Sequence, residues 1–221
     1  MTLPWPLKRL GLYGGSFDPI HRGHLEPLEE ARRNLDLDAV LFVPAHTVPH
    51  KPAGTSAGSH HRFAMVVLAI QAYPRFVVTD FEVVRGGTVY TVETLRHFRA
   101  VLPGTEVVLL MGSDSIVALP TWMEWREIAA SWRIGVLHRE PLGYAETASH
   151  LDPELAARLA PEGASPCEPA EDASIFWAGN GPVTISSTWI RRAVATGASL
   201  GGSLPPEVEA YARRQRLYLP A

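Results

Sequence analysis

The sequence predicts an α/β fold, a doubly wound parallel sheet with a small helical C-terminal end. Three observations predict it. Short apolar runs alternate along the chain with longer amphipathic segments, as in proteins whose strands and helices follow one another. The apolar runs are mostly continuous, as expected for parallel strands that helices cover on both faces. With 221 residues, 46% of them hydrophobic, the chain is long enough for a well-buried domain.

Six apolar runs are expected to form strands, the last of them with the weakest pattern. They lie at residues 10–13, 39–45, 76–79, 106–111, 133–138 and 174–178. Helices are expected at residues 23–34, 60–73, 91–102, 122–130, 187–196 and 205–216. The last of these begins at two prolines, which suit a helix start because the first N–H groups of a helix need no intrahelical acceptor.

The pattern weakens between residues 142 and 181, a segment rich in Ala, Pro and Glu. We expect a short helix and a variable surface loop there, inserted into a single domain that spans residues 1–221. A helical C-terminal part follows at residues 185–221. The sequence assigns no function to the insertion.

Charge and cysteine content exclude several classes of partner. The formal net charge of −3 creates no basic field for nucleic acid or an anionic membrane. No apolar run approaches the roughly 18 residues of a membrane span, and residues 1–15 lack the apolar run of a signal peptide. The one cysteine, Cys167, permits neither an internal disulfide nor a zinc cage of cysteines. We therefore expect a soluble cytoplasmic protein whose ligands are held by local features.

The first expected strand leads into GGSFDPIHRGH, which has the features of a phosphate-binding loop. Gly14 and Gly15 allow unusual dihedrals and a close approach of phosphate to main-chain N–H groups. His21 and His24 stand three residues apart at an expected helix start, so both imidazoles share one face beside the positive end of the helix dipole. They can donate hydrogen bonds to a polyphosphate. No third ligand stands nearby, so we predict no metal held by the protein.

A second motif, ISSTWIR, lies near the C-terminal end. Ser186 and Ser187 are expected to cap a helix and to leave N–H groups and hydroxyls free for phosphate. Arg191 follows one turn later and can add a fixed positive charge. An ordinary helix cap would explain the serines alone, but together with the first motif the phosphate role is the preferred interpretation.

These two motifs resemble the signatures of the nucleotidyltransferase superfamily that carries an HxGH motif, which implies a Rossmann-like nucleotidyltransferase fold. Three middle segments are similar to those of bacterial nicotinate-nucleotide adenylyltransferases: PAHTVPHK, EVVRGGTVYTVETL and GSDSIVALPTWMEW. The similarity runs from about residue 10 to residue 191 and continues weakly in LPPEVEAYARRQRLY. Two related families fit less well. Phosphopantetheine adenylyltransferases share the two end motifs but lack the three middle segments. Class I aminoacyl-tRNA synthetases would carry a KMSKS-like loop, which this sequence does not have.

The sequence departs from the family pattern at a few positions. Ser16 stands where threonine is usual, while Thr88 and Glu93 stand for serine and aspartate. Glu140 interrupts an Arg-Pro-Gly step, so no ligand role is carried over to Arg139.

The resemblance implies transfer of AMP from ATP to nicotinate mononucleotide, with Mg²⁺ held mainly by the ATP phosphates. It implies catalytic roles for His21, His24 and Arg191, which also bind ATP. The other residues of the implied ATP site are Gly14, Gly15, Ser16, Phe17, Gly112, Ser186 and Ser187. The implied mononucleotide site consists of Lys51, Tyr90, Thr91, Asp114 and Trp122.

Each mononucleotide residue also has a structural interpretation. Trp122 would stack on the pyridine ring, or else pack in the core. Asp114 would accept hydrogen bonds from ribose hydroxyls, or else cap a helix. Tyr90 and Thr91 would contact the carboxylate or the phosphate. Lys51 would bring positive charge to phosphate, or else remain solvated.

Four alternatives remain open. The acceptor could be nicotinamide mononucleotide, or the chain could be a relative that uses CTP. A non-catalytic nucleotide sensor could share the fold, although the presence of both histidines and the motif arginine disfavours it. A dehydrogenase is disfavoured because the glycines do not fit G-x-G-x-x-G.

Overall fold

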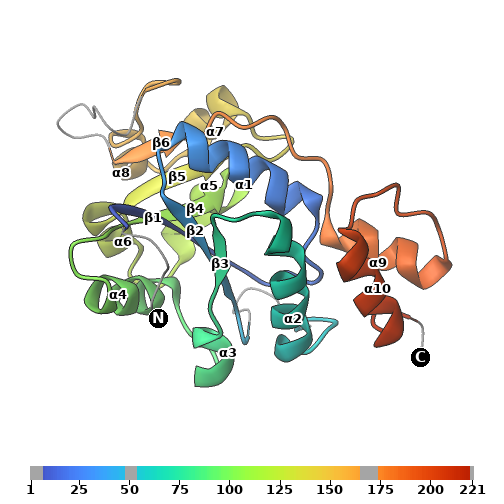
Figure 1. Ribbon diagram of the computed structural model, residues 1–221. Helices are drawn as coiled ribbons and strands as arrows, with labels where there is room; N and C mark the ends of the chain where they lie inside the picture. The colour runs from blue at the N-terminus through green and yellow to red at the C-terminus, as the bar shows by residue number, and fades with distance from the viewer. Residues whose placement is uncertain (1–6, 48–53, 165–173, 220–221) are drawn as a thin grey trace. The chain divides into compact units, whose positions relative to one another are not determined.

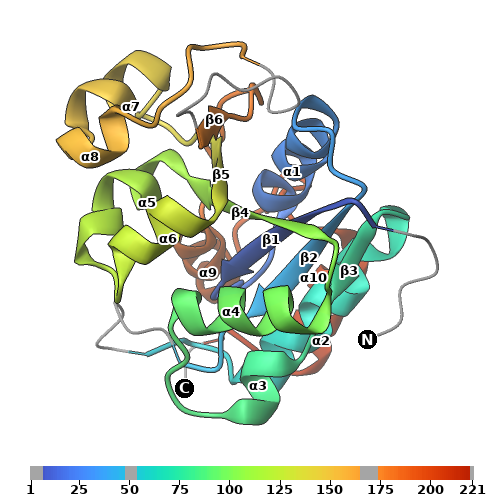
Figure 2. The same cartoon turned by 90° about the vertical axis from the view of Figure 1, so that its left-hand side faces the viewer.

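The computed structural model describes residues 7–47, 54–164 and 174–219, so Lys51 and Cys167 lie outside the described residues. Six strands form one sheet in the order β3-β2-β1-β4-β5-β6, which Figures 1 and 2 show. The strands are β1 (Arg9–Gly15), β2 (Ala39–Pro44), β3 (Phe76–Val78), β4 (Glu106–Gly112), β5 (Arg133–Leu137) and β6 (Ile175–Trp177). The pairs β1–β4, β4–β5 and β5–β6 are parallel. The predicted doubly wound α/β fold is confirmed.

Ten α-helices connect and flank the strands within the described residues. They are α1 (Arg22–Asn34), α2 (Ser59–Ala69), α3 (Phe81–Arg85), α4 (Thr91–Val101), α5 (Ser113–Ala118), α6 (Trp125–Ser131), α7 (Tyr144–His150), α8 (Pro153–Ala156), α9 (Ser187–Thr196) and α10 (Pro206–Arg214). Every expected strand and helix is present, while the short α3 and α5 were not expected. Between residues 142 and 181 there are two short helices and β6, where one short helix and a last strand were expected.

The expected start of α6 is wrong by three residues. Leu119–Thr121 form a 3₁₀ turn, and the N–H of Trp122 donates to the carbonyl of Leu119 at 2.8 Å. Glu124 has a left-handed backbone with φ 51°, which a right-handed helix cannot contain. The helix therefore begins only at Trp125, and Trp122 lies outside it.

The chain consists of two compact units. The first unit comprises Met1–Tyr13, Pro27–Leu41 and Tyr90–Val183. Strand β4 lies in the interior of this unit, where it is buried from Val107 to Gly112 and is covered by helices α4 and α5. The burial of β4 along both faces is the reason its sequence reads as a continuous apolar run.

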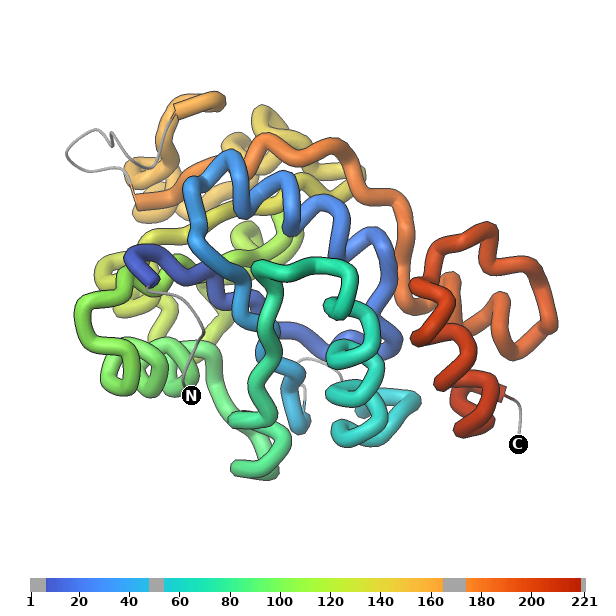
Figure 3. Tube along the Cα trace, viewed as in Figure 1, coloured from blue at the N-terminus to red at the C-terminus, as the bar shows by residue number. Residues whose placement is uncertain are grey.

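The second unit comprises Gly14–Glu26, Phe42–Val89 and Thr184–Ala221. Helix α10 packs against α2, and the trace in Figure 3 leaves α9 through a loop before it turns back into α10. Strands β1 and β2 have residues in both units, so the division does not separate two sheets. The single domain over residues 1–221 stays a prediction. Among the described helices, none combines the length and the apolar character that a membrane span requires.

Candidate active site

Two histidines lie together at the start of α1 in the second unit. The ring centroids of His21 and His24 are 3.7 Å apart, so the predicted shared face is confirmed. His21 directly precedes the helix and is 1% exposed, whereas His24 is partly exposed in the first turn. The backbone N–H of His21 donates to Nδ1 of His24 at 3.3 Å. A neutral His24 ring in this arrangement carries its proton on Nε2, which leaves that nitrogen as the donor.

The unusual backbone of the motif loop lies at Phe17 and not at the glycine pair. Phe17 has a φ of 47°, whereas neither Gly14 nor Gly15 has a positive φ. The expectation that the glycines adopt unusual dihedrals is therefore wrong. Gly15 is needed for space, because a Cβ there would come within 2.9 Å of the Phe17 ring. That ring is buried between His24 and Phe42, with centroids 5.6 Å from each, and so supports the histidine pair from one side.

Asp18 is a buried residue whose carboxylate links the motif loop to two other segments of the second unit, at residues 56–57 and at Tyr218. Its side chain accepts hydrogen bonds from the N–H groups of Ser56 at 2.7 Å and Ala57 at 3.1 Å. It also accepts the hydroxyl of Tyr218 at 2.9 Å. Three donors to one carboxylate offset the free energy of burying it at 2% exposure.

Arg62 is the most completely buried charge of the described residues, at 0% exposure. Its guanidinium donates to four main-chain oxygens, those of Ser16 at 2.6 Å, Ala45 at 2.6 Å, His46 at 2.9 Å and Ala57 at 3.1 Å. Burial lowers the pKa of Arg62, and the charge of Asp18 opposes that shift. The arginine thus ties the main chain at Ala45, His46 and Ala57 to the motif loop at Ser16.

Helix α9 presents the second motif to the first. Ser186 is the N-cap, and its hydroxyl oxygen accepts the N–H of Trp189 at 3.2 Å, as expected. The hydroxyl of Ser187 donates to the carbonyl of Pro19 at 2.9 Å. The expectation that both hydroxyls stay free for phosphate is therefore wrong for Ser187, whose proton ties α9 to the motif loop.

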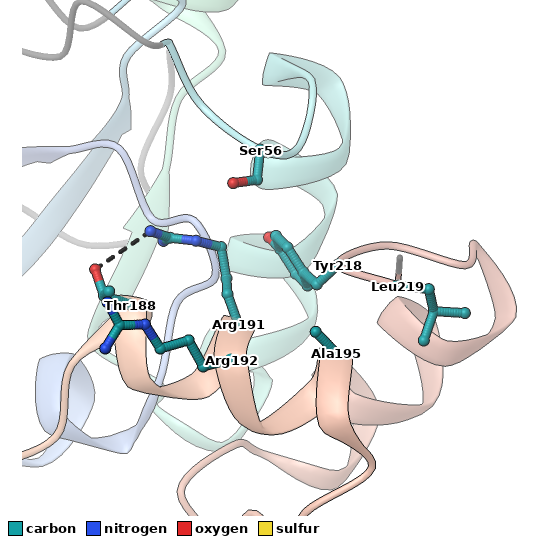
Figure 4. A pocket seen from close by; sticks show the side chains of 7 residues that line it. All are labelled: Ser56, Thr188, Arg191, Arg192, Ala195, Tyr218 and Leu219. Carbon is teal, nitrogen blue, oxygen red and sulfur yellow. Dashed lines mark hydrogen bonds between the residues drawn. The ribbon is translucent and has the colours of Figure 1, made fainter. Parts of the chain in front are cut away.

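Arg191 is fixed by two hydrogen bonds. Its Nη1 donates to the main-chain carbonyl of Asp18 at 2.6 Å, and its Nη2 donates to the hydroxyl of Thr188 at 3.2 Å. These bonds use two of its five N–H donors. The same side chain lines a pocket of about 450 Å³ together with Ser56, Thr188, Arg192, Ala195, Tyr218 and Leu219 (Figure 4). Two guanidinium groups and three hydroxyls make this pocket suitable for an anion.

In the first unit, Gly112 is the last residue of β4, and Asp114 follows it in the first turn of α5. Asp114 forms an ion pair with Arg139 at 3.5 Å, and its side chain is 55% exposed. The hydroxyl of Ser113 bonds both the N–H and the carbonyl of Arg139, at 3.0 and 3.1 Å. A Cβ at Gly112 would come within 2.6 Å of the Arg139 side chain, so the glycine permits this close approach. The N-cap of α5 is Gly112, and the helix-cap interpretation of Asp114 is wrong.

Burial in the first unit raises the pKa of Tyr13 to about 12, and the charges of Arg139 and Asp114 act on it in opposite directions. Its hydroxyl is therefore neutral near physiological pH.

The other predicted mononucleotide residues lie on separate elements of the first unit. Tyr90 is the N-cap of α4, is 37% exposed, and donates its N–H to the carboxylate of Glu93 at 2.9 Å. Thr91 is the first residue of that helix, and Trp122 is half-buried after the 3₁₀ turn. The N–H groups of Tyr90 and Trp122 both have intramolecular acceptors, which are the carboxylate of Glu93 and the carbonyl of Leu119.

Three residues of the site were not predicted from the sequence. Asp18 was quoted within the first motif but given no role. Arg62 stands in the apolar segment RFAMVVLAI, which was the available signal for a buried charge. Tyr218 stands in the weakly similar C-terminal end, where no pattern separates it from a surface tyrosine.

Comparisons with known proteins show which family the chain resembles. Residues 12–193 match the family described as Cytidylyltransferase-like. A protein of Aeromonas hydrophila subsp. hydrophila, described as a probable nicotinate-nucleotide adenylyltransferase, is 40% identical over 215 residues, which cover 96% of this chain and 98% of the relative. A protein of Synechococcus sp. (strain JA-3-3Ab) with the same description is 36% identical over 212 residues, 96% of this chain and 95% of the relative.

A solved structure shares the fold. The Plasmodium falciparum nicotinic acid mononucleotide adenylyltransferase complexed with NaAD has a TM-score of 0.71 and 17% sequence identity. The match covers 96% of this chain and 97% of that chain. At this identity the likeness extends to the fold alone.

Proposed function

Because the chain belongs to the nicotinate-nucleotide adenylyltransferase family, we propose that it transfers AMP from ATP to nicotinate mononucleotide. The products are nicotinate adenine dinucleotide and pyrophosphate. The observation that carries the proposal is the paired imidazoles of His21 and His24 at the start of α1, in a chain that matches its relatives over nearly full length.

The attacking group is the 5′-phosphate of the mononucleotide, which is already largely ionised near neutral pH. The protein therefore needs no strong base and acts by positioning the reactants and stabilising charge on the α-phosphoryl group and the leaving pyrophosphate. His24, with Nε2 as its donor, and His21 beside it would contact the ATP phosphates. Arg191 would add a positive charge that does not titrate near physiological pH.

Mg²⁺ would reach the site bound to the phosphates of ATP. Within the described residues there is no group of three His, Cys, Asp or Glu side chains able to hold a metal, and the nearby carboxylate of Asp18 already accepts three hydrogen bonds. Such surroundings fit a Mg²⁺ ion that takes most of its ligands from the ATP phosphates and from water, and few or none from protein side chains. When bound, Mg²⁺ supplies neutralising charge to the phosphates.

The remaining roles concern the two ligands. Gly14, Gly15, Ser16 and Phe17 would shape the ATP site, with Gly112, Ser186 and Ser187 adding to it. For the mononucleotide, Trp122 would stack on the pyridine ring and Asp114 would accept a ribose hydroxyl. Lys51 would bind phosphate. At the start of α4 the N–H groups of Thr91 and Val92 precede any intrahelical bond and would bind the nicotinate carboxylate.

A pyrophosphate-release assay with ATP or CTP and several mononucleotides tests this function. We expect ATP with nicotinate mononucleotide to give the highest kcat/KM. A carboxamide would turn an NH₂ group toward donors that suit a carboxylate, so nicotinamide mononucleotide should react about 10²-fold less efficiently. Equal kcat/KM values for the two mononucleotides would be consistent with AMP transfer but would contradict a preference for nicotinate. Release of pyrophosphate from CTP alone would remove the adenylyl specificity.

A further inference from the structure

The chain makes a strained turn after α10. Arg216 and Tyr218 are non-glycine residues with φ values of 54° and 65°, both in the left-handed region. The N–H of Leu217 donates to the carbonyl of Ala212 at 2.9 Å, the longer bond of a Schellman motif, in which glycine is preferred at the position of Arg216. Two such residues within three positions cost free energy, so contacts made by the turn must compensate for it.

The compensating contact leads to the motif loop. The turn directs the side chain of Tyr218 toward Asp18, and the tyrosine hydroxyl donates to Oδ1 of that carboxylate at 2.9 Å. Tyr218 and Arg191 line the same pocket (Figure 4). The Tyr218 hydroxyl in the C-terminal turn therefore donates to Asp18, the same residue whose main-chain carbonyl accepts a hydrogen bond from Arg191.

Resting on the proposed function, we infer that Tyr218 is a positioning residue for Arg191. Arg191 is bound through the main-chain carbonyl of Asp18 at 2.6 Å, while its Nη1 stays 3.9 Å from the Asp18 carboxylate. The carboxylate takes its close hydrogen bonds from three uncharged donors, which are Tyr218, Ser56 and Ala57. With these donors in place, the carboxylate does not draw the guanidinium away from the pocket.

The Tyr218 hydroxyl suits this role because it stays protonated. Burial raises the pKa of Tyr218 well above its usual value, and the charge of Asp18 raises it further. Without the hydroxyl, Oδ1 of Asp18 keeps only the N–H of Ala57 among these donors. Arg62 also carries a charge near Asp18, but its guanidinium donates to four main-chain oxygens. Arg191, with Nη1 at 3.9 Å from the carboxylate, would replace the lost hydrogen bond and turn from the pocket toward Asp18.

The variant Tyr218→Phe removes the hydroxyl and keeps the ring. We expect kcat for AMP transfer to fall about tenfold, the factor that one hydrogen bond to a charged group controls. KM for the mononucleotide should stay within about twofold. Tyr211→Phe is the matched control, since Tyr211 lies on α10 just before the turn and its hydroxyl bonds Nδ1 of His61 on α2 at 2.9 Å. Its kcat should match that of the unmodified protein, and thermal unfolding of both variants measures any loss of stability.

A second comparison separates positioning from a general loss of structure. Tyr218→Phe should have almost no effect on kcat when Arg191→Met is already present, because the hydroxyl acts through that arginine. An unchanged kcat in the single variant, an equal loss in the two backgrounds, or an equal loss in Tyr211→Phe would each overturn the inference.

A readout without turnover keeps the inference distinct from the proposed function. In ¹⁵N-arginine NMR spectra, with the Arg191 signal assigned from Arg191→Lys, Tyr218→Phe should shift the Nε–H resonance of Arg191, whereas Tyr211→Phe should not. An unmoved Arg191 signal overturns the positioning role. If the unmodified protein forms no dinucleotide, the proposed function fails, and the NMR comparison still decides the role of Tyr218.

Discussion

Asp18 and Arg62 in the second unit are buried and form hydrogen bonds on several sides, whereas Asp114 and Tyr90 in the first unit are exposed to solvent over 55% and 37% of their surface. Arg62 donates to four main-chain oxygens, and Asp18 accepts three hydrogen bonds. Asp114 has one ion pair at 3.5 Å. The second unit thus holds the groups proposed for phosphate binding in place before a ligand arrives, while the residues proposed for the mononucleotide are held by fewer hydrogen bonds of their side chains.

The largest expected effect is a loss of stability when a buried group of the second unit is removed. Arg62→Met keeps an unbranched side chain but leaves four main-chain oxygens without their donor. Chemical denaturation should show a loss of about 3 kcal/mol or more in the free energy of unfolding, because each buried unpaired group costs about 1–3 kcal/mol. Arg96→Met is the control, since Arg96 pairs with Glu124 and Glu127 on an exposed surface. It should unfold at nearly the unmodified midpoint, and a similar loss in both variants would contradict the account.

A smaller effect, on KM for the mononucleotide, is expected from a change in the first unit. Trp122→Ala should raise KM for the mononucleotide about tenfold, since stacking of a base on an aromatic ring contributes about 1–3 kcal/mol. KM for ATP and the unfolding midpoint should change little, because Trp122 is half-buried. Trp125→Ala removes a side chain that is 8% exposed and should lower the midpoint clearly. If Trp122→Ala unfolds like Trp125→Ala, the core-packing interpretation of Trp122 is correct.

The smallest effect is expected at Asp114. Asp114→Asn keeps the shape and removes the charge that faces Arg139. The ion pair is partly exposed, so stability should change by less than about 1 kcal/mol. Replacement of one of the two acceptor oxygens by an NH₂ donor should lower kcat/KM for the mononucleotide about fivefold, as one net hydrogen bond of about 1 kcal/mol allows. Steady-state kinetics at fixed ATP measures this, and an unchanged kcat/KM would remove Asp114 from the binding site.

The sequence predicted the parts of the fold that depend on local pattern. β4 reads as a continuous apolar run because it is buried from Val107 to Gly112, and the His21–His24 spacing predicted the shared face because helix geometry fixes it. The start of α6 was missed because Glu124 adopts a left-handed backbone that its residue type does not indicate. The helix-forming residues around it gave no sign of this turn.

The partners of buried polar groups could not be predicted. Arg62 and Ala57 lie near each other in sequence, but Ser16 is 46 residues away from Arg62 and Tyr218 is 200 residues away from Asp18. Such pairs form only when the fold brings distant segments together. A single sequence therefore showed the motif residues but not the network that holds them.

The most direct test of the account is the rate of a single turnover with ATP and nicotinate mononucleotide, measured as dinucleotide formed by the unmodified protein and by His24→Ala. The account predicts dinucleotide from the unmodified protein and a rate lower by roughly 10²–10³ in the variant, the scale of losing one preorganised donor to developing charge. ATP affinity, measured by calorimetry, should change much less, because the donor acts mainly in the transition state. A His24→Ala variant that forms dinucleotide at the unmodified rate would contradict the claim that the histidine pair stabilises phosphoryl charge.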